Sequence, residues 1–255
     1  MPKVKVGDIN IYYEIHGQGE PLVFISGAGV SHEPTLAIIP IYAEQFKCIL
    51  FDNRGVGKTD APDIPYTTEM MADDLAGMLD VIGISKANIS GTSMGGMIAQ
   101  QFAIHYPERV NRLILMCTYC GGTKSVPIHE SDLSDIDTVV SKCMTKQFIA
   151  ENPEVVENFK SWFSQGTSTV GMKHQGEAVM SHDTYENLSK ITAPTLIIAG
   201  DSDQIIPHEN SKILASNIPN SELVILPNTG HIMIEAGIQP HTLSIKFLKG
   251  ESVRS

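Results

Sequence analysis

Short apolar runs recur along the first half of the chain, and turn-forming residues separate them. Residues 3–6 and 9–15 flank Gly7-Asp8, a dipeptide typical of tight turns, so we expect a β-hairpin there. The runs that follow are too short for helices and predict buried strands. These strands cover residues 21–26, 48–51, 87–90 and 112–116.

Helical patterns alternate with these runs. Across residues 67–82 the apolar positions recur with a 3.6-residue spacing and form one face. Residues 94–105 predict a second helix, which ends before Pro107. A helix is also expected over residues 34–46, with Pro40 interrupting it.

The alternation stops between residues 121 and 190, where helical pieces at 139–150 and 153–163 mix with polar residues. It resumes with strands at 194–199 and 222–226 and helices at 207–216 and 239–248. Strands that alternate with helices predict an α/β fold, in which a mostly parallel twisted sheet has helices on both faces. We expect residues 1–120 and 191–255 to form this core, with residues 121–190 inserted over one edge of the sheet.

Composition narrows the class of protein. Hydrophobic residues make up 42% and charged residues 18%, which is a globular composition. The net charge of −11 argues against nucleic acid and anionic membrane surfaces as partners. No run approaches the roughly 18 apolar residues of a membrane span, and the N-terminus lacks the apolar core of a signal peptide. We therefore expect a cytoplasmic protein; a homodimer is left open.

The chain has four cysteines, of which Cys117 and Cys120 form a C-x-x-C pair. Zinc sites usually need a second pair of ligands, and no second C-x-x-C or H-x-x-x-H occurs. A redox pair is the alternative, but its position after a mid-chain strand favours buried core thiols. We expect neither a metal nor a cofactor.

Residues 91–95 read Gly-Thr-Ser-Met-Gly and fit G-x-S-x-G between a predicted strand and a predicted helix. In so sharp a turn the residues two positions from the serine crowd each other, and Gly91 and Gly95 avoid the clash by lacking a Cβ atom. The pattern predicts Ser93 as a nucleophile. The alternative is a glycine-rich turn that carries a serine by chance.

A serine hydroxyl is a weak nucleophile and needs a base. His231 follows a predicted strand at the same edge of the sheet, and only His32, near an earlier glycine turn, is a serious rival. The base needs a carboxylate to orient it, and Asp201 and Asp203 both follow a predicted strand directly.

Together these motifs resemble the α/β-hydrolase superfamily, in the branch of serine hydrolases with a small helical cap. Carboxylesterases and 3-oxoadipate enol-lactonase-like proteins belong to this branch. Four further stretches match family segments: residues 26–29 (the oxyanion-hole turn), 52–57 (D-x-R-G-x-G), 194–207 (P-T-L-I-I-x-G-x-x-D) and 230–231 (the final G-H).

The resemblance implies an α/β-hydrolase fold with a cap at residues 121–190. It also implies the chain order Ser93, Asp203, His231 for the catalytic residues. Its oxyanion donors would be the backbone N–H groups of Ala28 and Met94. The chain departs from the family in two places where histidine is common, because it has Ser26 and Thr92 there.

Other signals have competing interpretations. A dinucleotide site is disfavoured because His32 stands where the third glycine of G-x-G-x-x-G is needed. Arg54 either binds a substrate carboxylate or, as we favour, braces a loop. Large side chains of the insertion either line an apolar pocket above the nucleophile or form the core of the cap. They are Phe148, Phe159, Trp162, Phe163, Met172 and Met180.

We therefore expect a serine hydrolase that cleaves a small ester or lactone through an acyl-enzyme on Ser93. The resemblance also allows C–C bond hydrolysis, or cofactor-free haloperoxidase or perhydrolase activity, with the same residues. A small-molecule receptor with little turnover is the alternative from another class, because one fold can host unrelated functions.

Overall fold

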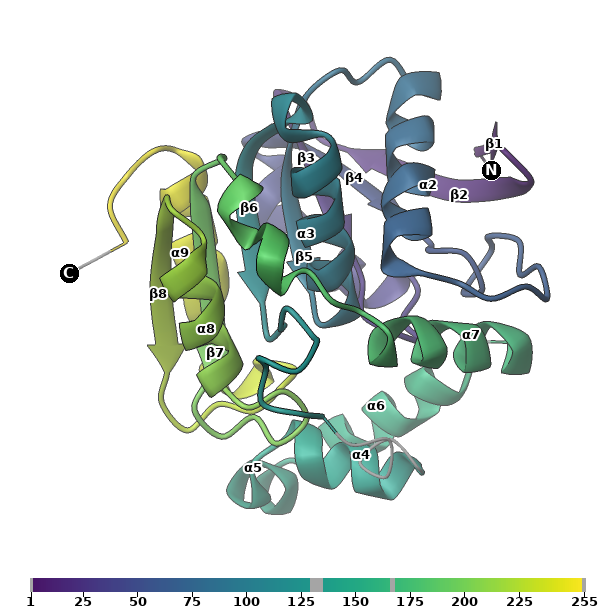
Figure 1. Ribbon diagram of the computed structural model, residues 1–255. Coiled ribbons are helices and arrows are strands. Elements are labelled where there is room, and N and C mark those ends of the chain that lie inside the picture. The colour runs from purple at the N-terminus through teal and green to yellow at the C-terminus, as the bar shows by residue number, and fades with distance from the viewer. Residues whose placement is uncertain (1, 129–134, 166–167, 254–255) are drawn as a thin grey trace.

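The computed structural model describes residues 2–128, 135–165 and 168–253 of the chain. Its centre is an eight-stranded sheet with the strand order β1-β2-β4-β3-β5-β6-β7-β8 (Figure 1). The strands are β1 (Lys3–Val6), β2 (Ile9–His16), β3 (Glu20–Ile25), β4 (Phe46–Phe51), β5 (Ala87–Thr92), β6 (Val110–Met116), β7 (Thr195–Gly200) and β8 (Ser221–Leu226).

The sheet is mostly parallel, as expected. Strands β3 to β8 pair in parallel, whereas β1 and β2 form the predicted hairpin and pair antiparallel at one edge. Because parallel strands need crossover connections, helices cover both faces and the central strands are buried on both sides. All six residues of β7 are buried, for example.

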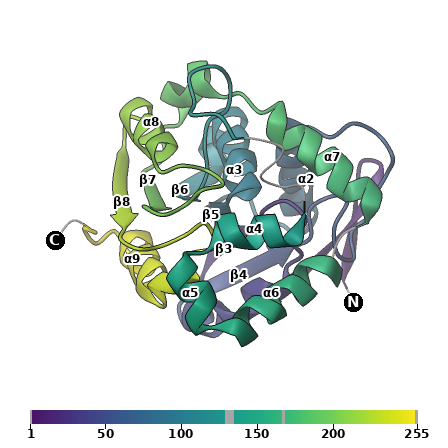
Figure 2. The same ribbon diagram turned by 90° about the horizontal axis from the view of Figure 1, so that it is seen from below.

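Helices α2 (Thr68–Val81), α3 (Met94–His105) and α8 (Glu209–Asn217) cover one face of the sheet over the larger hydrophobic cluster (Figures 1 and 2). Helices α1 (Ile39–Ala43) and α9 (Gln239–Leu248) cover the other face over a second cluster. Short 3-10 helices η1 (Glu33–Ala37), η2 (Pro107–Arg109), η4 (Tyr185–Lys190) and η5 (Ile234–Ala236) lie in the connections. The sheet therefore separates two cores.

The expected insertion consists of helices and lies between β6 and β7 in the chain. Helices α4 (Ile136–Cys143), α5 (Lys146–Glu151), α6 (Pro153–Gln165) and α7 (Thr169–Met180) lie below the carboxyl ends of the strands (Figure 1). Functional groups at these strand ends therefore face the insertion.

Two details of the insertion differ from expectation. Residues 139–150 belong to two helices rather than one, because Thr145 caps a new helix by accepting a hydrogen bond from Phe148 N–H at 3.2 Å. Helix α7 was not expected, since Gly171 and Gly176 weaken its helical pattern. Within the described residues, no helix combines the length and the hydropathy that a bilayer crossing requires.

Candidate active site

Ser93 stands at the turn between β5 and α3, where its φ of 57° and ψ of −123° are strained for a residue with a side chain. The close packing around this turn explains the two glycines. A Cβ atom on Gly91 would meet the carbonyl oxygen of Gly95, and one on Gly95 would meet that of Ile25. Thr118, which follows β6, stabilises the turn by donating a hydrogen bond to the Ser93 carbonyl at 2.8 Å.

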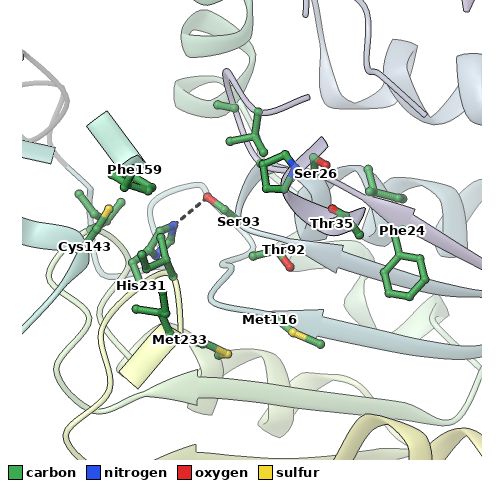
Figure 3. A pocket seen from close by; sticks show the side chains of 18 of the residues that line it. Phe24, Ser26, Thr35, Thr92, Ser93, Met116, Cys143, Phe159, His231 and Met233 are labelled. Carbon is green, nitrogen blue, oxygen red and sulfur yellow. Dashed lines mark hydrogen bonds between the residues drawn. The ribbon is translucent and has the colours of Figure 1, made fainter. Parts of the chain in front are cut away.

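The structure brings Ser93, His231 and Asp203 together from three loops at the same edge of the sheet. His231 Nε2 lies 3.0 Å from Ser93 Oγ, and His231 Nδ1 lies 2.7 Å from Asp203 Oδ2 (Figure 3). A carboxylate can only accept, so Nδ1 donates to Asp203 and the neutral ring turns an acceptor nitrogen toward the serine hydroxyl. This arrangement can remove the hydroxyl proton.

The carboxylate of Asp203 is itself fixed. Its Oδ1 accepts hydrogen bonds from the backbone N–H groups of Ile205 and Ile206, each at 2.9 Å. Asp203 and His231 are both buried. Asp201, the alternative acid, is exposed and contacts Ser202 instead, at 2.8 Å.

His32, the alternative base, contacts two carboxylates rather than the serine. Its Nδ1 lies 2.8 Å from Asp52 Oδ1, and its Nε2 lies 3.2 Å from Glu14 Oε1. Arg54 is also engaged: its Nε and Nη2 donate to the carboxylate of Asp74 at 2.6 and 2.7 Å. These contacts brace the loop after β4, the role favoured for Arg54 from the sequence.

The turn after β3 lies directly against the serine. A Cβ atom on Gly27 would stand 3.2 Å from Ser93 Cβ. Among the described residues, neither the N–H of Ala28 nor that of Met94 has a hydrogen-bond acceptor. Two amides without acceptors beside a nucleophile can stabilise a developing oxyanion.

Two residues of the insertion support the site and could not be found from a motif. The carbonyl of Cys143 accepts a hydrogen bond from the backbone N–H of His231 at 2.7 Å. Gln175, fully buried, accepts one from Gly29 N–H at 2.7 Å with its Oε1. Neither residue belongs to a short sequence pattern, since each contacts a segment far away in the chain.

Cys117 lies near Asp203 and His231, and within the described residues this group alone has the proximity to hold a metal ion. Burial raises the pKa of the Cys117 thiol well above its usual range, so the free thiol stays protonated and is a poor nucleophile, while Asp203 and His231 are already hydrogen-bonded to each other. All four cysteines are free and buried, Cys117 and Cys120 included.

A cavity of about 1850 Å³ opens over the serine. Phe159, Met172 and Met180 of the insertion line it. Phe148 does not: it packs against the larger hydrophobic cluster, because it lies on the separate helix α5. The side chains of Trp162 and Phe163 lie outside the described part of the structure.

Comparison with known proteins identifies the family. The chain matches the family described as alpha/beta hydrolase fold over residues 20–156 and again over 144–237. The 3-oxoadipate enol-lactonase 2 of Acinetobacter baylyi is 29% identical over 229 residues, which cover 86% of this chain and 85% of the relative. The poly(3-hydroxyalkanoate) depolymerase of Ectopseudomonas oleovorans is 30% identical over 246 residues, which cover 92% of this chain and 86% of the relative.

A solved structure agrees on the fold. The enol-lactonase from Burkholderia xenovorans LB400 superimposes with a TM-score of 0.89 at 24% identity, over 97% of this chain and all of that one (100%). The expected fold class is thus confirmed, and the chain belongs to the α/β-hydrolase fold family.

Proposed function

We propose that the protein is a serine hydrolase that cleaves an ester or a lactone through an acyl-enzyme on Ser93. The observation that carries the proposal is the continuous chain of contacts from Asp203 through His231 to Ser93, at 2.7 and 3.0 Å. A nucleophile, a base and an orienting carboxylate in this geometry are the parts that acyl transfer requires.

The first step of the proposed reaction forms the acyl-enzyme. Ser93 Oγ bonds to the carbonyl carbon while His231 Nε2 takes the hydroxyl proton. The N–H groups of Ala28 and Met94 stabilise the negative charge on the carbonyl oxygen, and each such donor is worth roughly 3–4 kcal/mol in related sites. His231 then protonates the leaving oxygen as its bond to the carbonyl carbon breaks.

The second step releases the product. A water molecule attacks the acyl carbon, His231 takes a proton from it, and the Ser93–acyl bond breaks as His231 returns the proton to Ser93 Oγ. Asp203 stays ionised and stabilises the protonated ring throughout. The scheme uses no metal, cofactor or macromolecular partner, and we propose a small-molecule substrate and a cytoplasmic location.

The names of the relatives support the bond class. By name, one relative acts on an enol-lactone and the other on a poly(3-hydroxyalkanoate), and a lactone and such a polyester both contain ester bonds. We also propose that residues 121–190 serve as a cap over the core, since α4–α7 lie beneath the strand ends that carry Ser93 and His231 (Figure 1).

Steady-state hydrolysis of 4-nitrophenyl acetate by the wild type, Ser93→Ala and His231→Ala tests this function. We expect turnover in the wild type and a loss of roughly a thousandfold or more in each variant. A single slow turnover with the ligand retained would favour a receptor. Near-normal turnover in His231→Ala would refute the role of this residue as the base.

A further inference from the structure

The cavity beside Ser93 reaches both faces of the sheet. One part, the cap arm, is lined by Gly176 of α7 and by Val139, Cys143, Phe159 and Ile205, four residues that belong to or pack against the larger hydrophobic cluster. The other part, the sheet arm, lies over the second cluster, and its lining includes Phe24, Ala37, Ile38, Tyr42, Ser90, Met116 and His241. Because the sheet separates the clusters, the cavity must pass around the carboxyl ends of the strands, beside the nucleophile.

The close-up agrees with this division. Phe159 and Cys143 lie on one side of the Ser93–His231 pair, and Phe24 and Thr92 lie on the other (Figure 3). A cavity of about 1850 Å³ is also larger than the ~300–1,000 Å³ that usually encloses a small ligand. A small ester would therefore leave one arm empty.

The sequence of β5 creates the sheet arm. Ser90 pairs with Phe24 on β3 and with Ile114 on β6, so these side chains share one face of the sheet. A serine between a phenylalanine and an isoleucine leaves a trough on the central strand. Thr92, which pairs with Met116, continues the trough toward Ser93.

The sheet arm suits an uncharged, apolar chain. Glu33 is the charged side chain of this part of the lining, and it is exposed and lies 3.9 Å from Lys58 Nζ. A polar pair also lines the arm, in which Tyr42 Oη lies 3.1 Å from His241 Nδ1. Burial lowers the pKa of His241 and raises that of Tyr42, so both groups are neutral at neutral pH. At the rim, Ile238 is 62% exposed and Ile234 is 40% exposed, and they offer apolar surface to a chain that extends outward.

The position of His231 assigns the two arms. The leaving oxygen must lie within hydrogen-bonding reach of His231 Nε2 to be protonated. The backbone N–H of His231 donates a hydrogen bond to the carbonyl of Cys143, and Cys143 lines the cap arm. A leaving alcohol within reach of His231 can therefore depart beneath the insertion, which leaves the other arm free for the acyl chain.

We propose that the sheet arm binds the acyl chain of the substrate, and that the preferred substrates are esters or lactones of acids with an unbranched apolar chain. This inference rests on the proposed function. Each methylene that enters the arm should raise kcat/KM roughly fourfold, the ratio expected for burial of one methylene group.

The test compares 4-nitrophenyl acetate, butyrate and octanoate as substrates of the wild type, Ser90→Leu and Gly176→Phe. Ser90→Leu fills the sheet arm, whereas Gly176→Phe projects into the cap arm, where a Cβ atom meets nothing within 4 Å. In the wild type we expect kcat/KM for octanoate to exceed that for acetate by at least about tenfold, because entry of only two of the six additional methylenes at roughly fourfold each is enough for that ratio. Ser90→Leu should abolish this ratio and Gly176→Phe should retain it.

If Ser90→Leu fails to fold, Ala37→Trp replaces it, since Ala37 lines the arm from an exposed position. Turnover of acetate without a preference for octanoate, or a preference abolished only by Gly176→Phe, would overturn the inference and leave the proposed function standing.

A folded wild type that hydrolyses none of the three esters would refute the proposed function instead. Calorimetric titration with octanoate then tests whether the sheet arm binds an acyl chain. Binding that Ser90→Leu weakens supports the arm as a site for an acyl chain, and absence of binding contradicts it.

Discussion

Gln175 on α7 accepts a hydrogen bond from Gly29 N–H at 2.7 Å, and its Nε2 donates to the carbonyl of Arg54 at 2.8 Å. One fully buried side chain thus joins the insertion to two loops of the core. Because Gly29 follows Ala28 directly, this contact fixes the turn that presents the proposed oxyanion donor.

Replacing Gln175 should therefore impair catalysis more than substrate binding. In Gln175→Met both hydrogen bonds are lost, and we expect kcat to fall by roughly ten- to a hundredfold, less than for deletion of an oxyanion donor. Gln175→Glu keeps an acceptor for Gly29 and should retain a higher kcat than Gln175→Met. Steady-state kinetics with 4-nitrophenyl acetate measure both. Equal kcat values in the two variants, or a change in KM alone, would contradict this positioning role.

The two neighbouring aspartates should differ sharply. Asp203 contacts His231 at 2.7 Å, so Asp203→Asn leaves the ring wrongly oriented and should lower kcat by roughly a thousand- to ten-thousandfold. Asp201 is exposed and contacts Ser202, so Asp201→Asn should change kcat less than about threefold. Parallel kinetics on the two variants check the assignment, which a reversed order of effects would overturn.

Replacement of Gly95 or Gly176 by alanine should have opposite effects on the stability of the fold. A Cβ atom on Gly95 would collide with the carbonyl of Ile25, so Gly95→Ala should destabilise the fold by about 2 kcal/mol or more. Gly176 lies inside α7 with no atom within 4 Å of a Cβ, so Gly176→Ala should stabilise it by about 0.5–1 kcal/mol. Urea denaturation measures both, and similar unfolding free energies would be inconsistent with the packing described.

The sequence predicts those elements whose ends depend on residues close by in the chain. Helix α3 was predicted with its observed ends, because Ser93 and Pro107 bound it locally. The strand positions were likewise readable from short apolar runs between turns. Within the insertion the sequence signals are weaker. The break between α4 and α5 is not predicted from the sequence, because it depends on a single N-cap residue, Thr145.

The site shows the same limit. Ser93 and His231 stand in short motifs, and the structure places their side chains 3.0 Å apart. Gln175 could not be found, since its contact with Gly29 spans 146 positions and depends on how the insertion docks. The sheet arm could not be predicted from the sequence either, because Ser90 forms a trough only when β5 lies between β3 and β6 in the folded sheet.

Stability should depend on pH through His182. Burial lowers the pKa of this histidine to about 3, whereas an unfolded chain has a histidine pKa of roughly 6.5. Between these values only the unfolded state binds the proton, so the unfolding free energy falls as the pH drops, by up to about 1.4 kcal/mol per pH unit.

Urea denaturation at pH 7 and pH 5 measures this effect. His182→Gln should show a smaller loss of unfolding free energy between the two pH values than the wild type does. His105→Gln, which removes a histidine near the surface, is the matched control and should behave like the wild type. An unchanged pH dependence in His182→Gln would exclude this residue as the source.

The most direct test of the central claim is covalent labelling with a fluorophosphonate, followed by intact-mass measurement and peptide mapping. The phosphonyl group bonds to an activated serine oxygen and fluoride leaves, so the reaction reports the nucleophile independently of the natural substrate. We predict one phosphonyl group per chain, on Ser93, and none in Ser93→Ala or in urea-unfolded wild type. Labelling that persists in Ser93→Ala, or a native wild type that takes up no label, would contradict the assignment of Ser93 as an activated nucleophile.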